Sequence, residues 1–413
     1  MKAVSDRQKF VWNMMGSLSN ACSTFILTIC VNRILGGNSG GLFSFAYANA
    51  QLMLTIGLFE VRPYQSTDID EHYSFNQYFS HRIITSILMI LSAVVYALVS
   101  EFDFEKSAVV IFLVMFKTVE AFTDVYGARF QQKDRIDLSG KLFFVRVVIS
   151  SLVFVILIFF TKDLIIGSLG MFVTSFGLFF IYDNRYTFET DKRNLSLDFS
   201  LFLKITMEVL PSFISSFILM YLSNASKYAI NDVYNDAVQN VYGIISMPAF
   251  VINLISMFIF NPMLVRMAYL WRDGKLKKMC QMIFYVYGVI LVVTVLAAGA
   301  ASLAGIPILS FVYGIDLGAY HTELILAMLV GSLGAFTTYL SKIIAVMRKQ
   351  KYMLVTIIFS FIYAFFCSKL MVRGLGIRGA ILSYGISLVI IVVLLNIVVF
   401  GTMLRRRKEL KHG

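Results

Sequence analysis

Apolar residues dominate the chain in long runs, and polar residues gather in short stretches between these runs. A helix that crosses the hydrocarbon core of a bilayer needs about 20 mostly apolar residues. By that rule the pattern predicts about twelve membrane-spanning helices, at residues 10–35, 40–59, 83–100, 108–128, 139–161, 163–182, 201–226, 237–262, 280–303, 321–346, 350–370 and 378–403. The expected class is therefore an all-α, polytopic membrane protein with short connections.

The fourth run ends in the stretch FKTVEAFTDVYGARF, residues 116–130, which places three charged residues in an otherwise apolar helix. At 100° per residue, Lys117, Glu120 and Asp124 point to about 0°, 300° and 340°, a single stripe about 60° wide. A charge at mid-bilayer costs about 2.5–3.5 kcal/mol, so the stripe is expected to face protein or water. Lys117 and Glu120 have opposite signs at i,i+3 spacing and can pair. Two interpretations stay open: an ion pair that only fixes helix packing, or the wall of a hydrated cavity.

Composition supports the membrane assignment. The chain is 58% hydrophobic and 15% charged, whereas soluble domains carry about 25% charged residues. The first apolar run is too long for the apolar part of a cleavable signal peptide, so none is expected. The four cysteines show no paired spacing, so neither a disulfide framework nor a metal site is predicted.

The basic residues are distributed unevenly between the two sides of the predicted membrane. If the N-terminus is cytoplasmic, 25 of the 36 Lys and Arg residues fall in cytoplasmic segments. This asymmetry predicts that both termini are cytoplasmic, and it accounts for the net charge of +12 without a nucleic-acid partner. The last outer loop, with Lys369, Arg373 and Arg378, is a local exception.

Other polar residues interrupt the runs. Arg146 lies about two turns inside the fifth run, where it either lines a cavity or extends its long side chain to the interface. Arg33 and Lys227 lie toward the outer side on this topology. The sequence contains no phosphate-binding GxxxxGK[ST] loop, no HExxH and no nucleophile elbow, so no catalytic residue, cofactor or metal is predicted.

A short internal repeat suggests two halves. STFILTICVN, residues 23–32, and SSFILMYLSN, residues 215–224, match at Ser, Phe-Ile-Leu and Asn. Each lies on the first helix of a half with six spans, which makes the halves parallel repeats. The predicted architecture is two six-helix lobes around a central cavity, with an N-terminal lobe at residues 1–195 and a C-terminal lobe at 196–413.

Several stretches of the sequence resemble one family of transporters. These stretches are RQKFVWNMMGSLSNACSTFILTICVNRILGG, GLFSFAYANAQLMLTIGLFEVRPYQSTDI, VEAFTDVYGARFQQKDRIDLSGKLFFVR, PSFISSFILMYLSNASKYAINDVYNDAVQNVYGIISMPAFVINLISMF and FVYGIDLGAY. They resemble the Wzx-like polysaccharide flippases of the multidrug/oligosaccharidyl-lipid/polysaccharide exporter superfamily, and together they span nearly the whole chain.

The resemblance implies a flippase of the bacterial cytoplasmic membrane and not an enzyme. It would move an undecaprenyl-pyrophosphate-linked oligosaccharide between leaflets by alternating access, for surface polysaccharide such as lipopolysaccharide or capsule. Membrane lipids surround it, and a polysaccharide polymerase and glycosyltransferases are candidate partners. The family pattern implies functional positions here, with substrate-binding cations at Arg33, Arg62, Lys117, Arg146 and Lys227 and coupling or cavity acids at Glu120 and Asp124.

The physical task agrees with cationic residues at such positions. Sugar hydroxyls cannot cross hydrocarbon without losing their hydrogen bonds, whereas a polyprenyl tail can stay in lipid. The diphosphate between them needs cations, and arginine suits phosphate because its guanidinium donates two parallel hydrogen bonds.

Three other functions remain possible at this point. A cation-coupled multidrug antiporter of the same superfamily would use Glu120 and Asp124 to bind its cargo or a proton. A membrane polysaccharide polymerase or ligase would need a sizeable outer loop with basic residues, which the sequence lacks. A scaffold that transports nothing would leave the buried charges without a use.

Overall fold

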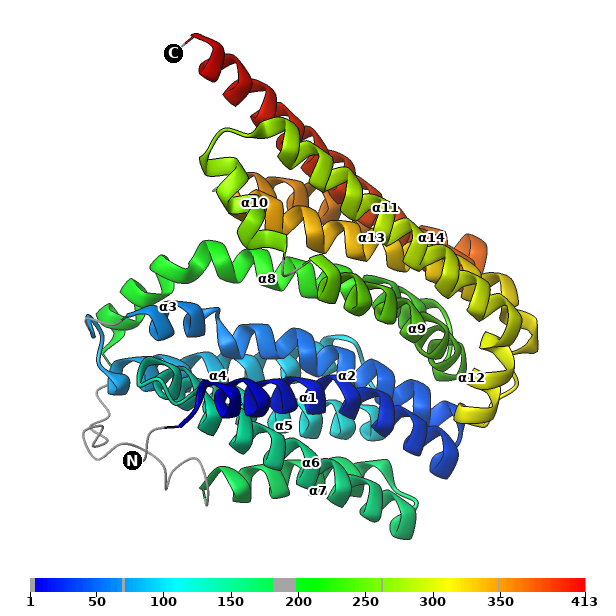
Figure 1. Ribbon diagram of the computed structural model, residues 1–413. Coiled ribbons are helices and arrows are strands. Elements are labelled where there is room, and N and C mark those ends of the chain that lie inside the picture. The colour runs from blue at the N-terminus through cyan, green and yellow to red at the C-terminus, as the bar shows by residue number, and fades with distance from the viewer. Residues whose placement is uncertain (1–3, 69–70, 181–197, 261–262, 348, 413) are drawn as a thin grey trace. The chain divides into compact units, whose positions relative to one another are not determined.

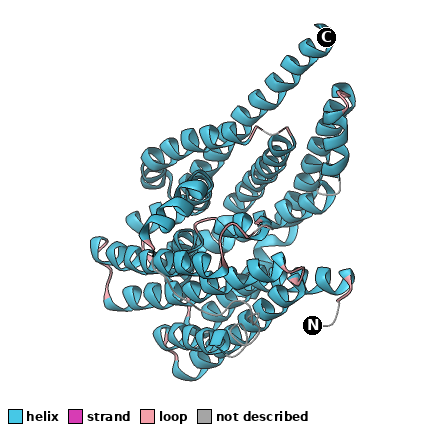
Figure 2. Cartoon of the chain, turned by 90° about the vertical axis from the view of Figure 1, so that its left-hand side faces the viewer, coloured by secondary structure: helices cyan, strands magenta, loops and turns pink. Residues whose placement is uncertain are grey.

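The computed structural model describes residues 4–68, 71–180, 198–260, 263–347 and 349–412. Every regular element among these residues is a helix (Figure 2). In the first part of the chain the helices are α1 (Asp6–Leu35), α2 (Gly37–Leu58), α3 (Val61–Thr67), α4 (Phe75–Val99), α5 (Phe104–Gln132), α6 (Ile136–Thr161), α7 (Leu164–Leu178) and α8 (Phe199–Val233) (Figure 1).

The remaining helices include four long apolar ones and two short ones, α10 and α12. They are α9 (Asp236–Phe260), α10 (Met263–Arg272), α11 (Leu276–Ala300), α12 (Ile306–Tyr313), α13 (His321–Val346) and α14 (Gln350–His412). A short π-helical stretch, Ala301–Gly305, joins α11 to α12. Gly376, with φ of 58°, kinks α14 and separates two successive apolar runs within it.

Each of the twelve predicted runs lies on a helix. Nine helices in the described residues are long and apolar enough to cross a membrane, and the nine include kinked α14, which holds two of the runs. The other two runs are α5, which carries the charged stripe, and α7, which is shorter in the described residues. The prediction of an all-α, multi-pass membrane protein is confirmed.

The chain divides into two compact units, Met1–Met220 and Tyr221–Gly413, and the division falls within α8. The predicted boundary between residues 195 and 196 lies outside the described residues, so those lobe limits stay a prediction. The two repeat segments lie on α1 and α8, and their matching asparagines, Asn32 and Asn224, are both buried.

Two helices extend further than the apolar runs predicted. Helix α4 begins at Phe75 because Ser74 and Gln77 form a capping box, with each side chain bonded to the other residue's backbone N–H. Arg82 therefore lies about two turns inside α4 and not at its start. Helix α8 continues to Val233, so Lys227 lies within the helix and not in an outer loop, which corrects its predicted place.

The unexpected basic residues of the last predicted outer loop have acidic partners in the second unit. Lys369 Nζ lies 2.9 Å from Asp232 at the end of α8, and Arg378 Nε lies 2.6 Å from Glu323 at the start of α13. Paired in this way, Lys369 and Arg378 add little net charge to their end of the unit.

In the first unit, α3 is tied to the end of α5 through the loop that follows it. Glu71 accepts hydrogen bonds from Lys133 (2.8 Å) and Arg129 (2.9 Å). These two bonds lower the pKa of the Glu71 carboxyl below its ordinary value, against a smaller opposing effect of burial. Gln132 also donates to the backbone oxygen of Asp68 (2.9 Å), which fixes the loop at a second point.

Helices α1 and α6 approach each other closely at two glycines. A Cβ built on Gly16 would lie 2.8 Å from the backbone oxygen of Gly140, and one on Gly140 would lie 2.6 Å from the backbone nitrogen of Asn13. Small residues allow such backbone contact between membrane helices. The contact places Asn13 of α1 beside the start of α6.

Gly140→Ala is expected to destabilise the solubilised protein by about 1–3 kcal/mol, because backbone atoms cannot yield to the added methyl group. Thermal unfolding in detergent measures the change. The control is Gly288→Ala in α11, where an added Cβ meets nothing within 4 Å. Alanine favours a helix over glycine there, so the control should keep or raise the unfolding temperature. Equal unfolding temperatures for the two variants would contradict the close α1–α6 contact.

Candidate functional site: a charged cavity in the first unit

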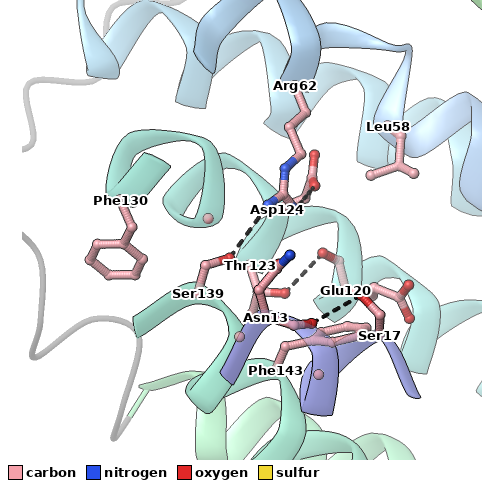
Figure 3. A pocket seen from close by; sticks show the side chains of 13 residues that line it. Asn13, Ser17, Leu58, Arg62, Glu120, Thr123, Asp124, Phe130, Ser139 and Phe143 are labelled. Carbon is pink, nitrogen blue, oxygen red and sulfur yellow. Dashed lines mark hydrogen bonds and ion pairs between the residues drawn. The ribbon is translucent and has the colours of Figure 1, made fainter. Parts of the chain in front are cut away.

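A cavity of about 270 Å³ lies inside the first unit, between α1, α3, α5 and α6 (Figure 3). Seven of its thirteen lining residues have polar or charged side chains, although it lies among apolar helices. The lining residues are Asn13, Gly16, Ser17, Leu58, Arg62, Glu120, Thr123, Asp124, Gly127, Phe130, Ser139, Gly140 and Phe143. Three of them carry a formal charge: Arg62, Glu120 and Asp124.

Asp124 holds two arginines from different helices. Its Oδ1 lies 2.9 Å from Nη1 of Arg62 on α3, and its Oδ2 lies 3.0 Å from Nη2 of Arg82 on α4. The Arg82 side chain is 1% exposed and that of Asp124 is 10% exposed, while that of Arg62 is 36% exposed. One carboxylate thus neutralises a fully buried cation and also holds the cation that reaches the cavity.

The end of α2 supplies a further partner for Arg82. The helix stops at Leu58, and both Phe59 (φ 46°) and Glu60 (φ 54°) are left-handed before α3 begins. Carbonyl groups in the last turn of a helix have no partner within it. The Gly57 carbonyl accepts a hydrogen bond from Arg82 Nη1 and another from Thr85 Oγ1 at 2.8 Å. Where α2 ends, Arg82 and Thr85 therefore supply the hydrogen bonds that the Gly57 carbonyl would otherwise lack.

Arg62 fits beside α5 because residue 127 is glycine. A Cβ at Gly127 would lie 2.7 Å from the Ser139 hydroxyl and 3.4 Å from Arg62 Nη1. The Ser139 hydroxyl accepts a long hydrogen bond, 3.4 Å, from Arg62 Nη2. Figure 3 shows the Arg62 side chain reaching from α3 toward Asp124 and Ser139 on the cavity wall. Its guanidinium is held between two elements and still faces the cavity.

Deeper along α5, Lys117 and Glu120 form the second charged pair. Lys117 Nζ lies 2.7 Å from Glu120 Oε2, so the pairing predicted from i,i+3 spacing is confirmed. The Lys117 side chain is 0% exposed and that of Glu120 is 13% exposed. Lys117 Nζ also lies 5.1 Å from the centre of the Tyr47 ring and 5.4 Å from that of Phe116. Glu120 reaches the cavity, whereas Lys117 stands behind it.

The other predicted cations are not among the residues that line this cavity. Arg146 is buried on α6, bonds the Ser175 hydroxyl through Nη1 (3.2 Å) and stacks on Phe143. Arg33 is exposed in the last turn of α1. Lys227 is half-buried on the part of α8 that belongs to the second unit. The structure therefore brings Arg62, Lys117, Glu120 and Asp124 together in the first unit, where Arg33 and Arg146 do not line the cavity.

Neither Ser139 nor the pairing of Arg82 with Asp124 was predicted from the sequence. The sequence feature that could have indicated the position of Arg82 is the capping box at Ser74 and Gln77. It sets the start of α4 at Phe75 and therefore places Arg82 within the helix. In the described part of the chain, no three His, Cys, Asp or Glu residues gather in a way that would hold a metal ion.

Solved structures share the fold along almost the whole chain. A multidrug resistance MATE family transporter of the MOP superfamily, in an inward-facing conformation, aligns with a TM-score of 0.67 at 14% identity, over 98% of this chain and 98% of its own. The lipid II flippase MurJ, in an inward closed conformation, aligns with a TM-score of 0.70 at 13% identity, over 96% of this chain and 90% of its own.

A third similar structure is a MOP superfamily transporter from Pyrococcus furiosus, described by a reverse polarity of its binding pocket. It aligns with a TM-score of 0.54 at 14% identity, over 97% of this chain and 95% of its own. No family model and no curated protein matches the sequence. At these identities the likeness shows that the chain has the fold of MOP superfamily transporters.

Proposed function

We propose that the chain is a transporter that moves a lipid-linked oligosaccharide with an anionic diphosphate, of the undecaprenyl-pyrophosphate type, across the bacterial cytoplasmic membrane by alternating access. The proposal keeps both termini in the cytoplasm, as the distribution of Lys and Arg predicts, and the cavity of the first unit would then lie near the inner headgroup level. The fold supports transport in general, since it is shared by a MATE transporter and by a lipid II flippase.

One observation carries the proposal furthest: Arg62 presents a partly exposed guanidinium to a polar cavity inside an apolar helical unit. Buried charges in a membrane protein are costly, and they are found where a substrate or ion pathway uses them. Asp124 and Ser139 hold two arms of the guanidinium in place, so the group is positioned before cargo arrives. Arginine donors in a fixed arrangement suit phosphate oxygens.

The cavity volume of about 270 Å³ limits what it can hold. Pockets for drug-sized ligands are commonly about 300–1,000 Å³. The cavity therefore suits the phosphate portion of a cargo or a coupling ion, and not a whole oligosaccharide. Within the proposal Arg62 meets the diphosphate, and Arg33 and Lys227 are further contacts along the route.

Within the proposal, Lys117 and Arg146 cannot contact cargo in the conformation described, because both side chains are buried among protein groups. For Lys117 to reach cargo, its ammonium must leave the Glu120 carboxylate. We propose that Glu120 and Asp124 act as coupling or cavity acids that release and recapture these cations during transport.

The acidic residues of the same cavity support a second candidate function. Glu120 and Asp124 both line the cavity, and a carboxylate on the wall can bind a cationic drug, a proton or a metal cation. A cation-coupled multidrug antiporter would use the two acids directly, with Arg62 and Lys117 as their resting partners. The two functions differ in what Arg62 does.

Arg62→Ala is the variant that separates them. Asp124 keeps its bond to Arg82, so the protein should stay folded, while a contact to phosphate worth about 1.5–3 kcal/mol disappears. Flipping of a fluorescent polyprenyl-diphosphate sugar in proteoliposomes is expected to fall about tenfold to hundredfold. Arg62→Lys should retain part of the activity, because it keeps the charge and loses the two-pronged donor geometry.

Arg405→Ala, at an exposed position near the end of α14, serves as the matched control and should flip normally. Ethidium efflux driven by an ion gradient is measured on the same proteoliposomes. Efflux without any flipping would favour the antiporter, and undiminished flipping by Arg62→Ala would refute the proposed contact.

A further inference from the structure

The second unit contains a larger cavity that the proposed transport route does not use. It measures about 850 Å³ and lies where the start of α11 faces the last turns of α14. The wall combines cations with apolar side chains: Gly274, Lys275, Leu276, Lys277, Lys278, Cys280, Phe400, Met403, Leu404 and Arg407. Four of these residues are cationic and none is acidic.

Three of the cations are available for a ligand. Lys275 pairs with Asp273 at 3.2 Å, and that acid also pairs with Arg272. Lys277, Lys278 and Arg407 are exposed and form no ion pair within the described residues. Helix α11 adds to the positive potential, since no side chain caps its N-terminus and no acidic residue lies in its first turn. The charge of the cavity favours an anion.

Neighbouring aromatic residues place the cavity at the level of the lipid headgroups. Trp and Tyr gather at the membrane–water interface. Tyr269 and Trp271 lie on α10, just before the loop that enters the cavity. The Arg406 guanidinium stacks 4.1 Å from the Trp271 ring centre, and Arg272 lies 5.0 Å from that of Tyr269. The backbone N–H of Gly274, on the cavity wall, donates to the Trp271 carbonyl (3.2 Å).

The opposite side of the cavity is apolar and continues toward lipid. Phe284 of α11 stacks on Phe400 of α14, with ring centres 5.8 Å apart, which links the two helices below the cations. Leu404 is 59% exposed and Phe284 is 57% exposed, although both belong to helices that span the membrane. Cations above an open apolar surface match a molecule with an anionic head and an acyl tail.

We infer that this cavity is a binding site for an anionic phospholipid, separate from the transport route. Lys277, Lys278 and Arg407 bind the phosphate, and an acyl chain lies along Phe400, Met403 and Leu404. Basic pockets between membrane helices take lipid phosphates in this manner. The bound lipid bridges the start of α11 and the end of α14.

The test uses the full chain in nanodiscs and Trp271 as the reporter. The chain has two tryptophans, so Trp12→Phe leaves Trp271 as the single fluorophore. Brominated phosphatidylglycerol in a phosphatidylcholine nanodisc is expected to quench Trp271 more than brominated phosphatidylcholine does at the same mole fraction. Lys278→Gln with Arg407→Gln should lower the relative affinity for phosphatidylglycerol by about 10- to 30-fold.

Arg405→Gln with Lys408→Gln is the matched control, because it also removes two positive charges, both from positions of α14 outside the cavity wall. It should keep the excess quenching. Equal quenching by the two lipids, or the same loss in both double variants, would overturn the site. Inorganic phosphate is added in a separate measurement. If it abolishes the excess quenching, the site binds free phosphate and the proposal of a lipid site is wrong.

Discussion

Asp124→Ala is expected to lower the yield of folded, monodisperse protein severely, with a destabilisation of about 3–5 kcal/mol. The substitution removes the carboxylate shared by Arg62 and Arg82. Arg62 is partly exposed and can turn to water, but Arg82 is 1% exposed and cannot. An uncompensated buried charge is the reason for the size of the effect. Membrane extraction followed by size-exclusion chromatography measures it.

Two further variants test that reason. Asp273→Ala also removes an acid that holds two cations, Arg272 and Lys275, but these pairs are exposed, so the yield of folded protein should change little. Asp124→Ala combined with Arg82→Met removes the stranded charge, and Thr85 still bonds the Gly57 carbonyl. This double variant should recover much of the yield. Similar yields for Asp124→Ala and Asp273→Ala would refute the bridging role.

The second large effect concerns the Lys117–Glu120 pair, where the two single variants should differ. Glu120→Ala leaves Lys117, 0% exposed, without the carboxylate that balances its charge, so loss of folded protein should be heavy. Lys117→Ala leaves Glu120, which lines the cavity and can take up water or a proton there. We therefore expect the lysine variant to assemble better than the glutamate variant.

The double variant Lys117→Ala with Glu120→Ala separates structure from function. No uncompensated charge remains, so assembly should return. If Lys117 meets the diphosphate during transport, this variant folds and fails to flip cargo, while Lys117→Arg keeps part of the activity. Surface-polysaccharide display, measured beside membrane abundance, distinguishes the cases. Normal display from the double variant would reduce the pair to a packing role.

Local patterns in the sequence were sufficient for the helices and for one of the two charged pairs. Each predicted apolar run lies on a helix in the described residues, because membrane helices must be long and apolar whatever their neighbours are. The Lys117–Glu120 pair followed from spacing along one helix. These are properties of a segment alone, and a single sequence displays them.

The rest of the cavity depends on residues that are far apart along the chain. Asp124 meets Arg62 and Arg82 across 62 and 42 positions, and no local pattern pairs them. The apolar run also placed the start of α4 too late, because hydropathy does not register a capping box. Arg146 looked similar to the other cations in sequence, yet its hydrogen bond to Ser175 on α7 keeps it apart from the cavity.

The Gly57 carbonyl oxygen, which accepts two hydrogen bonds, can serve as a spectroscopic reporter. A carbonyl stretch falls in frequency with each hydrogen bond that the oxygen accepts, and this oxygen accepts from both Arg82 and Thr85. A carbon-13, oxygen-18 label at that single peptide group would shift its infrared band away from the other amides. The band would report whether the Arg82 arm stays in place as ligands or ion gradients are applied, and no side chain would have to be altered.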